Sequence, residues 1–164
     1  MNKLIIIRGN SGSGKTTVAK MLQQKLGLNT LLISQDVVRR EMAYVKDGQD
    51  NSAIPLLIKL LEHGHAHNRV TILEGIFYQK WYANLFEIAK VLYKDEIYAY
   101  YYELEFEETL KRHSTKANAK EFGEDAMRRW GIEKDNLDLV EEKKIQQHEK
   151  DEEVVARIFS EIKR

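Results

Sequence analysis

Apolar runs and amphipathic stretches alternate along this chain of 164 residues. The first run, Leu4–Ile7, is short and continuous, which is the pattern of a strand that is covered on both faces. Such strands are expected at 4–7, 30–34, 70–73 and 97–104, with a weaker fifth around 144–146. Elsewhere, apolar residues recur at the spacing of one helix face. These helices are expected at 15–26, 36–45, 52–62, 81–93, 106–113 and 151–162.

The alternation of strands and helices sets the expected fold class. Parallel strands need a crossover connection, and a helix in each connection covers one face of the sheet. The pattern therefore predicts an α/β fold of three layers, in which helices flank a five-stranded, doubly wound parallel sheet. The sequence contains no repeat, low-complexity tract or proline-rich linker, so we expect a single domain over residues 1–164.

Composition narrows the class of protein without changing this fold. Apolar residues make up 43% of the chain and charged residues 32%, a balance typical of globular proteins. Lys and Arg together number 26, as do Asp and Glu, so no overall charge attracts the chain to nucleic acid or anionic lipid. The sequence lacks cysteine and any apolar stretch near the roughly 20 residues of a membrane span. We therefore expect a cytoplasmic protein with no membrane partner.

A glycine-rich segment directly follows the first apolar run. Gly9, Gly14, Lys15 and Thr16 occupy every fixed position of the pattern G-x-x-x-x-G-K-[ST], between a predicted strand and a predicted helix. This pattern is the P-loop, whose backbone N–H groups bind phosphate oxygens at the positive end of the helix. Lys15 can reach the outer phosphates, and the Thr16 hydroxyl can ligate Mg²⁺. The predicted nucleotide-binding residues are Gly9, Asn10, Ser11, Gly12, Ser13, Gly14, Lys15, Thr16 and Thr17.

A second polar cluster follows the second predicted strand. Asp36 and Arg39 are three residues apart, so they lie on one face of the predicted helix. Ligands of such sheets bind at the carboxyl ends of the strands, where the P-loop and Asp36 must both lie. A carboxylate there can orient or deprotonate a hydroxyl that attacks the γ-phosphorus, and an arginine can hold an anionic group. Capping of its own helix is the alternative role for Asp36.

Glu74 ends the third predicted strand, which should lie beside the strand that leads into the P-loop. Its carboxylate is therefore expected to face the magnesium ion through the water shell of that ion. The alternative is a turn carboxylate that meets only solvent.

The P-loop, followed by a strand and by the D-x-x-R pattern of Asp36 and Arg39, resembles the small P-loop kinases. This group includes polynucleotide 5′-hydroxyl kinase of the phage type, chloramphenicol phosphotransferase and the zeta toxins. The resemblance covers the chain from Met1 to about Trp130 and implies the P-loop NTPase fold. It also implies that Asp36 is the catalytic base and that Arg39 binds the acceptor or the transferring phosphate. The segment around Glu74 is similar to one in uridine kinases, whose acidic residue lies near the magnesium ion.

The same resemblance implies a small helical lid over residues 112–130. Related kinases carry two arginines about four residues apart at the mouth of this lid, and the chain offers Arg112 followed by Lys116. We expect Arg112 to contact the ATP phosphates and assist catalysis, with Lys116 as a second contact. Lysine lacks the guanidinium fork, so it stays open whether Lys116 replaces the second arginine. Arg128 is a further candidate, and a solvated helix face is the alternative for the whole segment.

Two other groups of side chains are weaker candidates for a functional site. His63, His65 and His67 alternate near the end of a predicted helix, and we interpret them as contacts of the helix end rather than as metal ligands. The tyrosines at 98–102 are expected to pack in the sheet. The aromatic residues between 77 and 81 are expected in the core and at its rim, with a pocket for a flat substrate as the alternative.

Together these features predict a kinase that uses ATP and Mg²⁺ to phosphorylate a hydroxyl of a small molecule, a nucleoside or a nucleic-acid 5′ end. The balanced charge disfavours a long nucleic acid without excluding it. The guanine-reading pattern N/T-K-x-D is absent, which favours ATP over GTP. The alternative function is a nucleotide-dependent regulatory or binding module that hydrolyses ATP slowly. The acceptor and the oligomeric state stay open.

Overall fold

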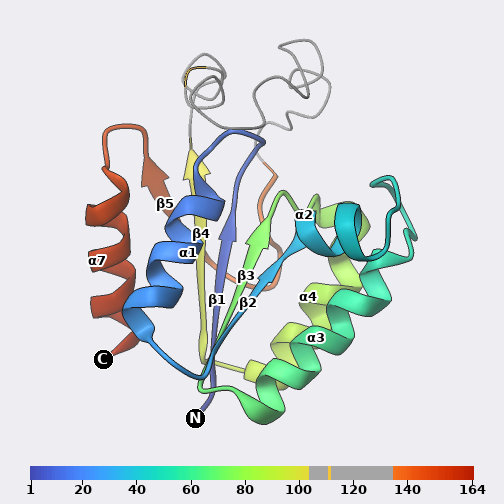
Figure 1. Cartoon of the computed structure of the whole chain (residues 1–164), viewed down its shortest axis with the longest axis horizontal. Coiled ribbons are helices and arrows are strands. Elements are labelled where there is room, and N and C mark those ends of the chain that lie inside the picture. The colour runs from blue at the N-terminus through green and yellow to red at the C-terminus, as the bar shows by residue number, and fades with distance from the viewer. Residues whose placement is uncertain (104–110, 112–134) are drawn as a thin grey trace.

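The computed structural model describes residues 1–103, 111 and 135–164 of the chain. A five-stranded sheet crosses the middle of the molecule in the order β2-β3-β1-β4-β5, and every neighbouring pair is parallel (Figure 1). Its strands are β1 (Lys3–Arg8), β2 (Thr30–Ser34), β3 (Val70–Gly75), β4 (Ile97–Glu103) and β5 (Glu142–Gln146). The predicted α/β class and the parallel sheet are confirmed.

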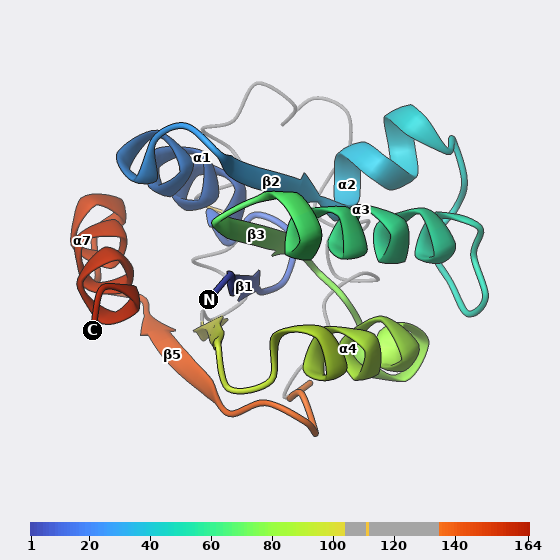
Figure 2. The ribbon, with the colours of Figure 1, turned by 90° about the horizontal axis from the view of Figure 1, so that it is seen from below.

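Helices cover both faces of this sheet and complete the three layers (Figure 2). One face carries α1 (Lys15–Leu26) and α7 (Asp151–Ile162). The other face carries α3 (Ala53–His67) and α4 (Gln79–Tyr93). Among the described helices, none is long and apolar enough to span a membrane.

The central strand β1 is buried on both faces. Successive residues of a strand point to opposite sides, so Leu4 and Ile6 pack in the core that α3 and α4 cover. Ile5 and Ile7 pack in the core that α1 and α7 cover. All four side chains are fully buried, which explains why the sequence shows an unbroken apolar run instead of an alternating one.

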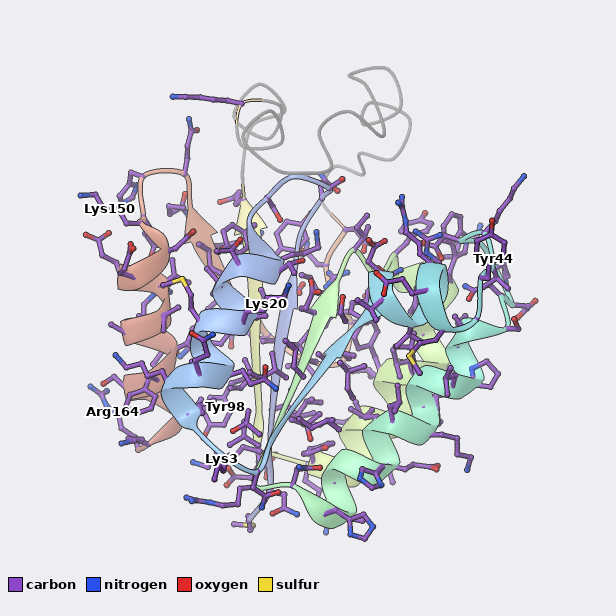
Figure 3. The ribbon with its side chains drawn as sticks, in the orientation of Figure 1. Lys3, Lys20, Tyr44, Tyr98, Lys150 and Arg164 are labelled. Atoms are coloured by element: carbon purple, nitrogen blue, oxygen red, sulfur yellow. The ribbon has the colours of Figure 1, made fainter. Side chains whose placement is uncertain are left out.

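The helix predicted over 36–45 is wrong in its extent. The chain forms one short turn, α2 (Gln35–Val37), and continues as a π-helix, η1 (Val38–Met42), which ends with a bond from the Ala43 N–H to the Val38 carbonyl. Tyr44 then adopts a φ of 54°, a left-handed conformation that a helix cannot continue. Its side chain projects away from the body of the molecule (Figure 3). The apolar spacing carried the prediction on to Val45, whose side chain packs on the core from outside the helix.

The helix predicted over 52–62 continues further, as α3, to His67. The last turns of α3 are polar, so they interrupt the apolar spacing on which the prediction rests. Their side chains nevertheless pack in the folded chain. The rings of His63 and His67 lie 4.6 Å apart, and the ring of His65 meets that of Tyr93 at 4.9 Å. These ring contacts agree with the interpretation of the histidines as residues of the helix end.

The tyrosines of β4 pack in the sheet as expected, and one of them connects the sheet to α7. Tyr100 is fully buried, and its hydroxyl donates a hydrogen bond to Glu161 Oε2 at 2.6 Å. Lys143, on the neighbouring strand β5, donates to the same oxygen at 2.7 Å. Partial burial alone would raise the pKa of Glu161, but the hydrogen bonds from Lys143 and Tyr100 outweigh that effect and lower it.

This lowered pKa predicts a pH-dependent contribution of Glu161 to stability. A carboxyl whose folded-state pKa is below its unfolded-state value stabilises the fold above the ordinary value of 4.5, and less as the pH falls through the folded-state pKa. Glu161→Gln should therefore lower the free energy of unfolding at neutral pH. Urea titrations of both proteins across the acid range should show the difference shrinking as the pH falls. A difference that is constant over that range would contradict the ionic contribution.

Candidate functional site

The P-loop connects β1 to α1, and Gly9 and the residues from Gly12 to Lys15 are buried in it. Gly14 directly precedes α1 with a φ of 97°, a conformation that favours glycine and turns the chain sharply into the helix. The Lys15 side chain folds back over the loop, and its Nζ donates to the Asn10 carbonyl at 3.3 Å. The loop therefore combines the N-terminal end of a helix of 12 residues with a lysine charge. This is the arrangement that the sequence predicts for binding phosphate.

Thr16 and Glu74 come together beside this loop. The Thr16 hydroxyl donates to Glu74 Oε2 at 3.2 Å, and the carboxylate is 1% exposed. The second oxygen, Oε1, is buried and has no hydrogen-bond partner among the described residues. A buried carboxylate oxygen without a partner is costly, and a cation or its bound water would satisfy it. Oxygen ligands of this kind suit Mg²⁺, so the residues present fit that ion.

The strand register brings the segment of Asp36 to the same edge of the sheet. Glu74 pairs with Ile7 of β1 on one side and with Ser34 of β2 on the other. The chain leaves β1 for the P-loop and leaves β2 for Asp36, so both segments flank Glu74 at the carboxyl ends of the strands (Figure 1). This is the edge at which such sheets bind ligands.

Asp36 lies in α2 with its side chain 58% exposed. Its Oδ1 forms ion pairs with Arg39 Nη2 at 3.3 Å and with Arg40 Nε at 3.0 Å. Arg39 is more buried, and its Nη1 also donates to the Val45 carbonyl at 3.2 Å. Arg39 therefore holds both the carboxylate and the segment that follows η1. A contact of Arg39 with the acceptor stays a prediction, as does the role of Asp36 as a base.

The predicted lid contains the remaining candidate residues of the site. Arg112, Lys116 and Arg128, like the rest of residues 112–130, lie outside the described residues. Their contacts with ATP stay predictions.

The aromatic residues after β3 pack against one another and against α4. Phe77 is fully buried, and its ring meets those of Tyr82 and Phe86 edge to face at 5.2 and 5.8 Å. Tyr78 and Trp81 pack against each other at 5.1 Å. These contacts agree with core and rim packing, the interpretation that the sequence favours for this segment.

Arg8 is a residue that sequence analysis missed. It ends β1 directly before the P-loop, and its side chain is fully buried. Nε and Nη2 donate to the two carboxylate oxygens of Glu142, at 2.7 and 2.9 Å. Nη1 donates to Asp135 Oδ2 at 2.8 Å and to the Phe77 carbonyl at 2.7 Å. The only signal in the sequence is an arginine placed between an apolar strand and a P-loop.

This arginine joins segments that are far apart in the sequence. Asp135 also accepts a bond from the Gln79 N–H, at the first residue of α4, and Glu142 begins β5. Burial would lower the pKa of Arg8, but its bonds to Glu142 and Asp135 outweigh that effect and raise it. The guanidinium therefore stays charged and anchors the start of the P-loop to α4 and β5.

Comparisons with known proteins agree with this arrangement. A family model described as an AAA domain matches residues 4–130. A comparison of the sequence with curated proteins finds no match.

Solved structures similar to this chain include several small kinases. A gluconokinase from Sinorhizobium meliloti 1021 has a TM-score of 0.70 at 12% identity, over 98% of this chain and 91% of that chain. The APS kinase of Mycobacterium tuberculosis, in complex with AMPPNP and APS, has a TM-score of 0.65 at 17% identity, over 99% and 98%. The shikimate kinase of Aquifex aeolicus has a TM-score of 0.51 at 19% identity, over 98% and 96%. The predicted fold, a P-loop and a five-stranded parallel sheet with helices on both faces, is thereby confirmed.

The Arg8 contacts predict a large loss of stability when this side chain is removed. Arg8→Met leaves the carboxylates of Asp135 and Glu142 without their buried counter-charge, which should cost about 3–5 kcal/mol of unfolding free energy. Urea denaturation measures this loss. The exposed pair of Lys59 and Glu62, which is as short at 2.8 Å, provides the control. Lys59→Met should change stability by no more than about 0.5 kcal/mol, and equal effects of the two variants would refute the assignment.

Proposed function

The chain belongs to the AAA-domain family whose model matches residues 4–130, and we propose that it is a kinase that uses ATP and Mg²⁺ to phosphorylate a hydroxyl of a small molecule. The observation that carries this proposal is the pairing of Thr16 with the buried carboxylate of Glu74 beside the P-loop. The P-loop, the pair of Thr16 and Glu74, and the segment of Asp36 lie at one edge of the sheet.

The P-loop supplies the nucleotide site in this proposal. Its backbone N–H groups and the start of α1 would bind the β- and γ-phosphates of ATP. Lys15 would exchange its bond to the Asn10 carbonyl for the phosphate oxygens. Thr16 and Glu74 would hold Mg²⁺, the carboxylate through water, and the ion when bound neutralises charge on the phosphates.

Asp36 supplies the acceptor side. The acceptor oxygen forms a bond to the γ-phosphorus while the bond from that phosphorus to the β–γ bridging oxygen breaks, and ADP leaves. The hydroxyl proton passes to the Asp36 carboxylate, which is exposed enough to meet an acceptor from solvent. Arg39 holds this carboxylate and can reach an anionic group of the acceptor. Arg112 and Lys116 would add positive charge around the transferring group.

The proposed acceptor class is a small hydroxyl compound. The similar structures carry the names gluconokinase, shikimate kinase and APS kinase, which are kinases of small molecules. The balanced charge of the chain gives no electrostatic attraction for a long nucleic acid, although a nucleoside or a 5′ end stays in the test. A slow ATPase that signals rather than phosphorylates is the alternative. This alternative is favoured if the ion pairs of Asp36 with Arg39 and Arg40 serve only to hold the fold.

Transfer of label from γ-labelled ATP to a panel of metabolites, nucleosides and oligonucleotides tests the function. The proposal expects a labelled acceptor, whereas a regulatory ATPase releases only labelled phosphate.

Lys15→Ala should abolish nucleotide binding. Asp36→Ala should leave ATP affinity nearly unchanged and lower turnover by about 10²–10⁴-fold, the usual contribution of a general base. Glu41→Ala, at an exposed carboxylate of η1, is the matched control and should keep the turnover of the parent. Equal turnover for Asp36→Ala and the parent would remove the base assignment.

Glu74→Gln tests the magnesium site separately. The amide keeps the shape of the side chain but loses the charge, so the Mg²⁺ concentration for half-maximal ATP binding should rise by about 10- to 100-fold. Calorimetric titration of ATP at several Mg²⁺ concentrations measures this shift without any acceptor. Glu161→Gln, which removes a carboxylate hydrogen-bonded to the β4 residue Tyr100, should leave the Mg²⁺ dependence unchanged. An unshifted Glu74→Gln curve would exclude Glu74 from the metal site.

A further inference from the structure

A polar cluster, buried at Gln35 and Tyr82 and half-buried at Asp47 and Asn51, lies next to the segment of Asp36. Gln35 begins α2 directly before Asp36, and Tyr82 lies in the first turns of α4. Asp47 and Asn51 belong to the segment between η1 and α3. Gln35 is 2% exposed and Tyr82 is fully buried, so these polar groups are withdrawn from solvent.

The side chains of Gln35, Asp47 and Tyr82 are hydrogen-bonded to one another in a ring. The Tyr82 hydroxyl donates to Asp47 Oδ1 at 2.5 Å and accepts from Gln35 Nε2 at 2.9 Å. Gln35 Nε2 also donates to Asp47 Oδ2 at 3.2 Å. Asp47 Oδ1 accepts two further bonds, from the Gly48 N–H at 3.0 Å and from Asn51 Nδ2 at 3.3 Å. A buried polar network with its partners in place holds its members in one arrangement.

Gln35 connects this network to the end of β3. Its Oε1 accepts a hydrogen bond from the Ile76 N–H at 3.1 Å, two residues after Glu74. Gly75 makes this approach possible, because a Cβ at that position would lie 2.5 Å from the Gln35 Cβ. The backbone just before Asp36 is thus fixed against the backbone just after Glu74.

The side chain of Asp36 is connected to the same segment by a second route. Arg39 pairs with Asp36 and also donates to the Val45 carbonyl, two residues before Asp47. The Val45 N–H donates in turn to the Arg39 carbonyl at 3.0 Å. Backbone and side chain of Asp36 therefore both depend on where residues 45–47 lie, and the Tyr82 hydroxyl holds Asp47.

We propose that the cluster of Gln35, Asp47 and Tyr82 sets the position of Asp36 relative to Glu74, and that the Tyr82 hydroxyl thereby controls the rate of phosphoryl transfer. This inference rests on the proposed function and names the residues that fix its geometry. Tyr82 is a positioning residue, since its buried hydroxyl is bonded to Asp47 and Gln35 within the protein. A misplacement of about 1 Å at a reacting group can cost about 10²-fold in rate, so a shift of this segment is expected to show in turnover.

The protonation of Tyr82 suits this role. Burial raises the pKa of its hydroxyl, and the hydrogen bond to Asp47 raises it further. The hydroxyl therefore stays a donor to Asp47 at neutral pH. Its ring packs edge to face on Phe77, so Tyr82→Phe can remove the hydrogen bonds while the ring stays in the core.

Tyr93 provides a matched control on the same helix. It is 3% exposed, and its hydroxyl bonds to that of Thr71 at 2.9 Å. Eleven positions along α4 separate it from Tyr82, a distance of about 16 Å at the rise of an α-helix. Tyr93→Phe therefore removes a buried tyrosine hydroxyl of the same kind far from Asp36.

The kinetic test measures kcat and KM of the full-length protein with γ-labelled ATP and the acceptor that the panel identifies. Tyr82→Phe should lower kcat by about 10- to 100-fold and change the KM for ATP by less than about twofold. Tyr93→Phe should leave both values within about twofold of the parent. In an Asp36→Ala background, Tyr82→Phe should cause almost no further loss, because its effect passes through Asp36. A parent-like kcat for Tyr82→Phe, or an equal loss in both backgrounds, would overturn the proposal.

Amide hydrogen exchange of the full-length proteins without acceptor gives an independent test. Tyr82→Phe should speed exchange in residues 35–51 and at Ile76, whereas Tyr93→Phe should not, with thermal melting as the check that both variants fold. Unchanged exchange in Tyr82→Phe would overturn the inference whether or not an acceptor is known. A parent protein that labels no acceptor would overturn the proposed function and the control of rate. The exchange comparison would then still decide whether the cluster fixes the segment of Asp36.

Discussion

The register of β3 between β1 and β2 is the constraint on which the site depends. Glu74 points to the same face of the sheet as Ile72, toward α1, and Thr16 lies in the first turn of that helix. A slip of one residue in this pairing would turn Glu74 to the opposite face and would bring the apolar Leu73 to face Thr16. The register is held by apolar side chains buried on both faces of β3. Packing of the core therefore determines where the carboxylate stands.

Two buried charges at this edge of the sheet differ in how they are compensated. The Arg8 guanidinium donates to Glu142, Asp135 and the Phe77 carbonyl, so its hydrogen-bonding groups are used within the protein. Glu74 receives one bond from Thr16 and keeps a buried oxygen with no partner among the described residues. A buried carboxylate oxygen without a partner is expensive, and a bound cation or its water would satisfy it. Arg8 thus has the features of a structural anchor and Glu74 those of a ligand.

The sequence predicts those parts of the fold that depend on local patterns. The P-loop follows from residue types at fixed spacing, and the strands follow from apolar runs, so their positions are close to those observed. The end of the 36–45 helix could not be found in this way, because the left-handed Tyr44 interrupts an apolar spacing that continues to Val45. Local periodicity carries no information on such a backbone change.

Sequence analysis missed Arg8 and Gln35 for a related reason. Arg8 finds its carboxylates 127 and 134 positions away, and Gln35 finds the Tyr82 hydroxyl 47 positions away. Contacts at such separations leave no period in the sequence, so they emerge only when the sheet assembles. The strand that follows the Asp135 segment, β5, gave a weak signal for another reason. Only Ile145 is buried in it, and polar residues fill its other positions.

That polarity has a consequence for the outer border of the sheet. In the described sheet β5 pairs only with β4, and its Lys144 carbonyl accepts a bond from the Arg157 side chain of α7 at 3.3 Å. Main-chain groups that stay unpaired on an edge strand are a template that another chain could extend. Lys143 and Lys144 stand on this strand and pair with Glu161 and Glu103 of the same molecule. Charged side chains on an edge strand disfavour its pairing with another chain. The residues that make β5 hard to recognise in the sequence are thus of the kind that suits a strand at the border of a sheet.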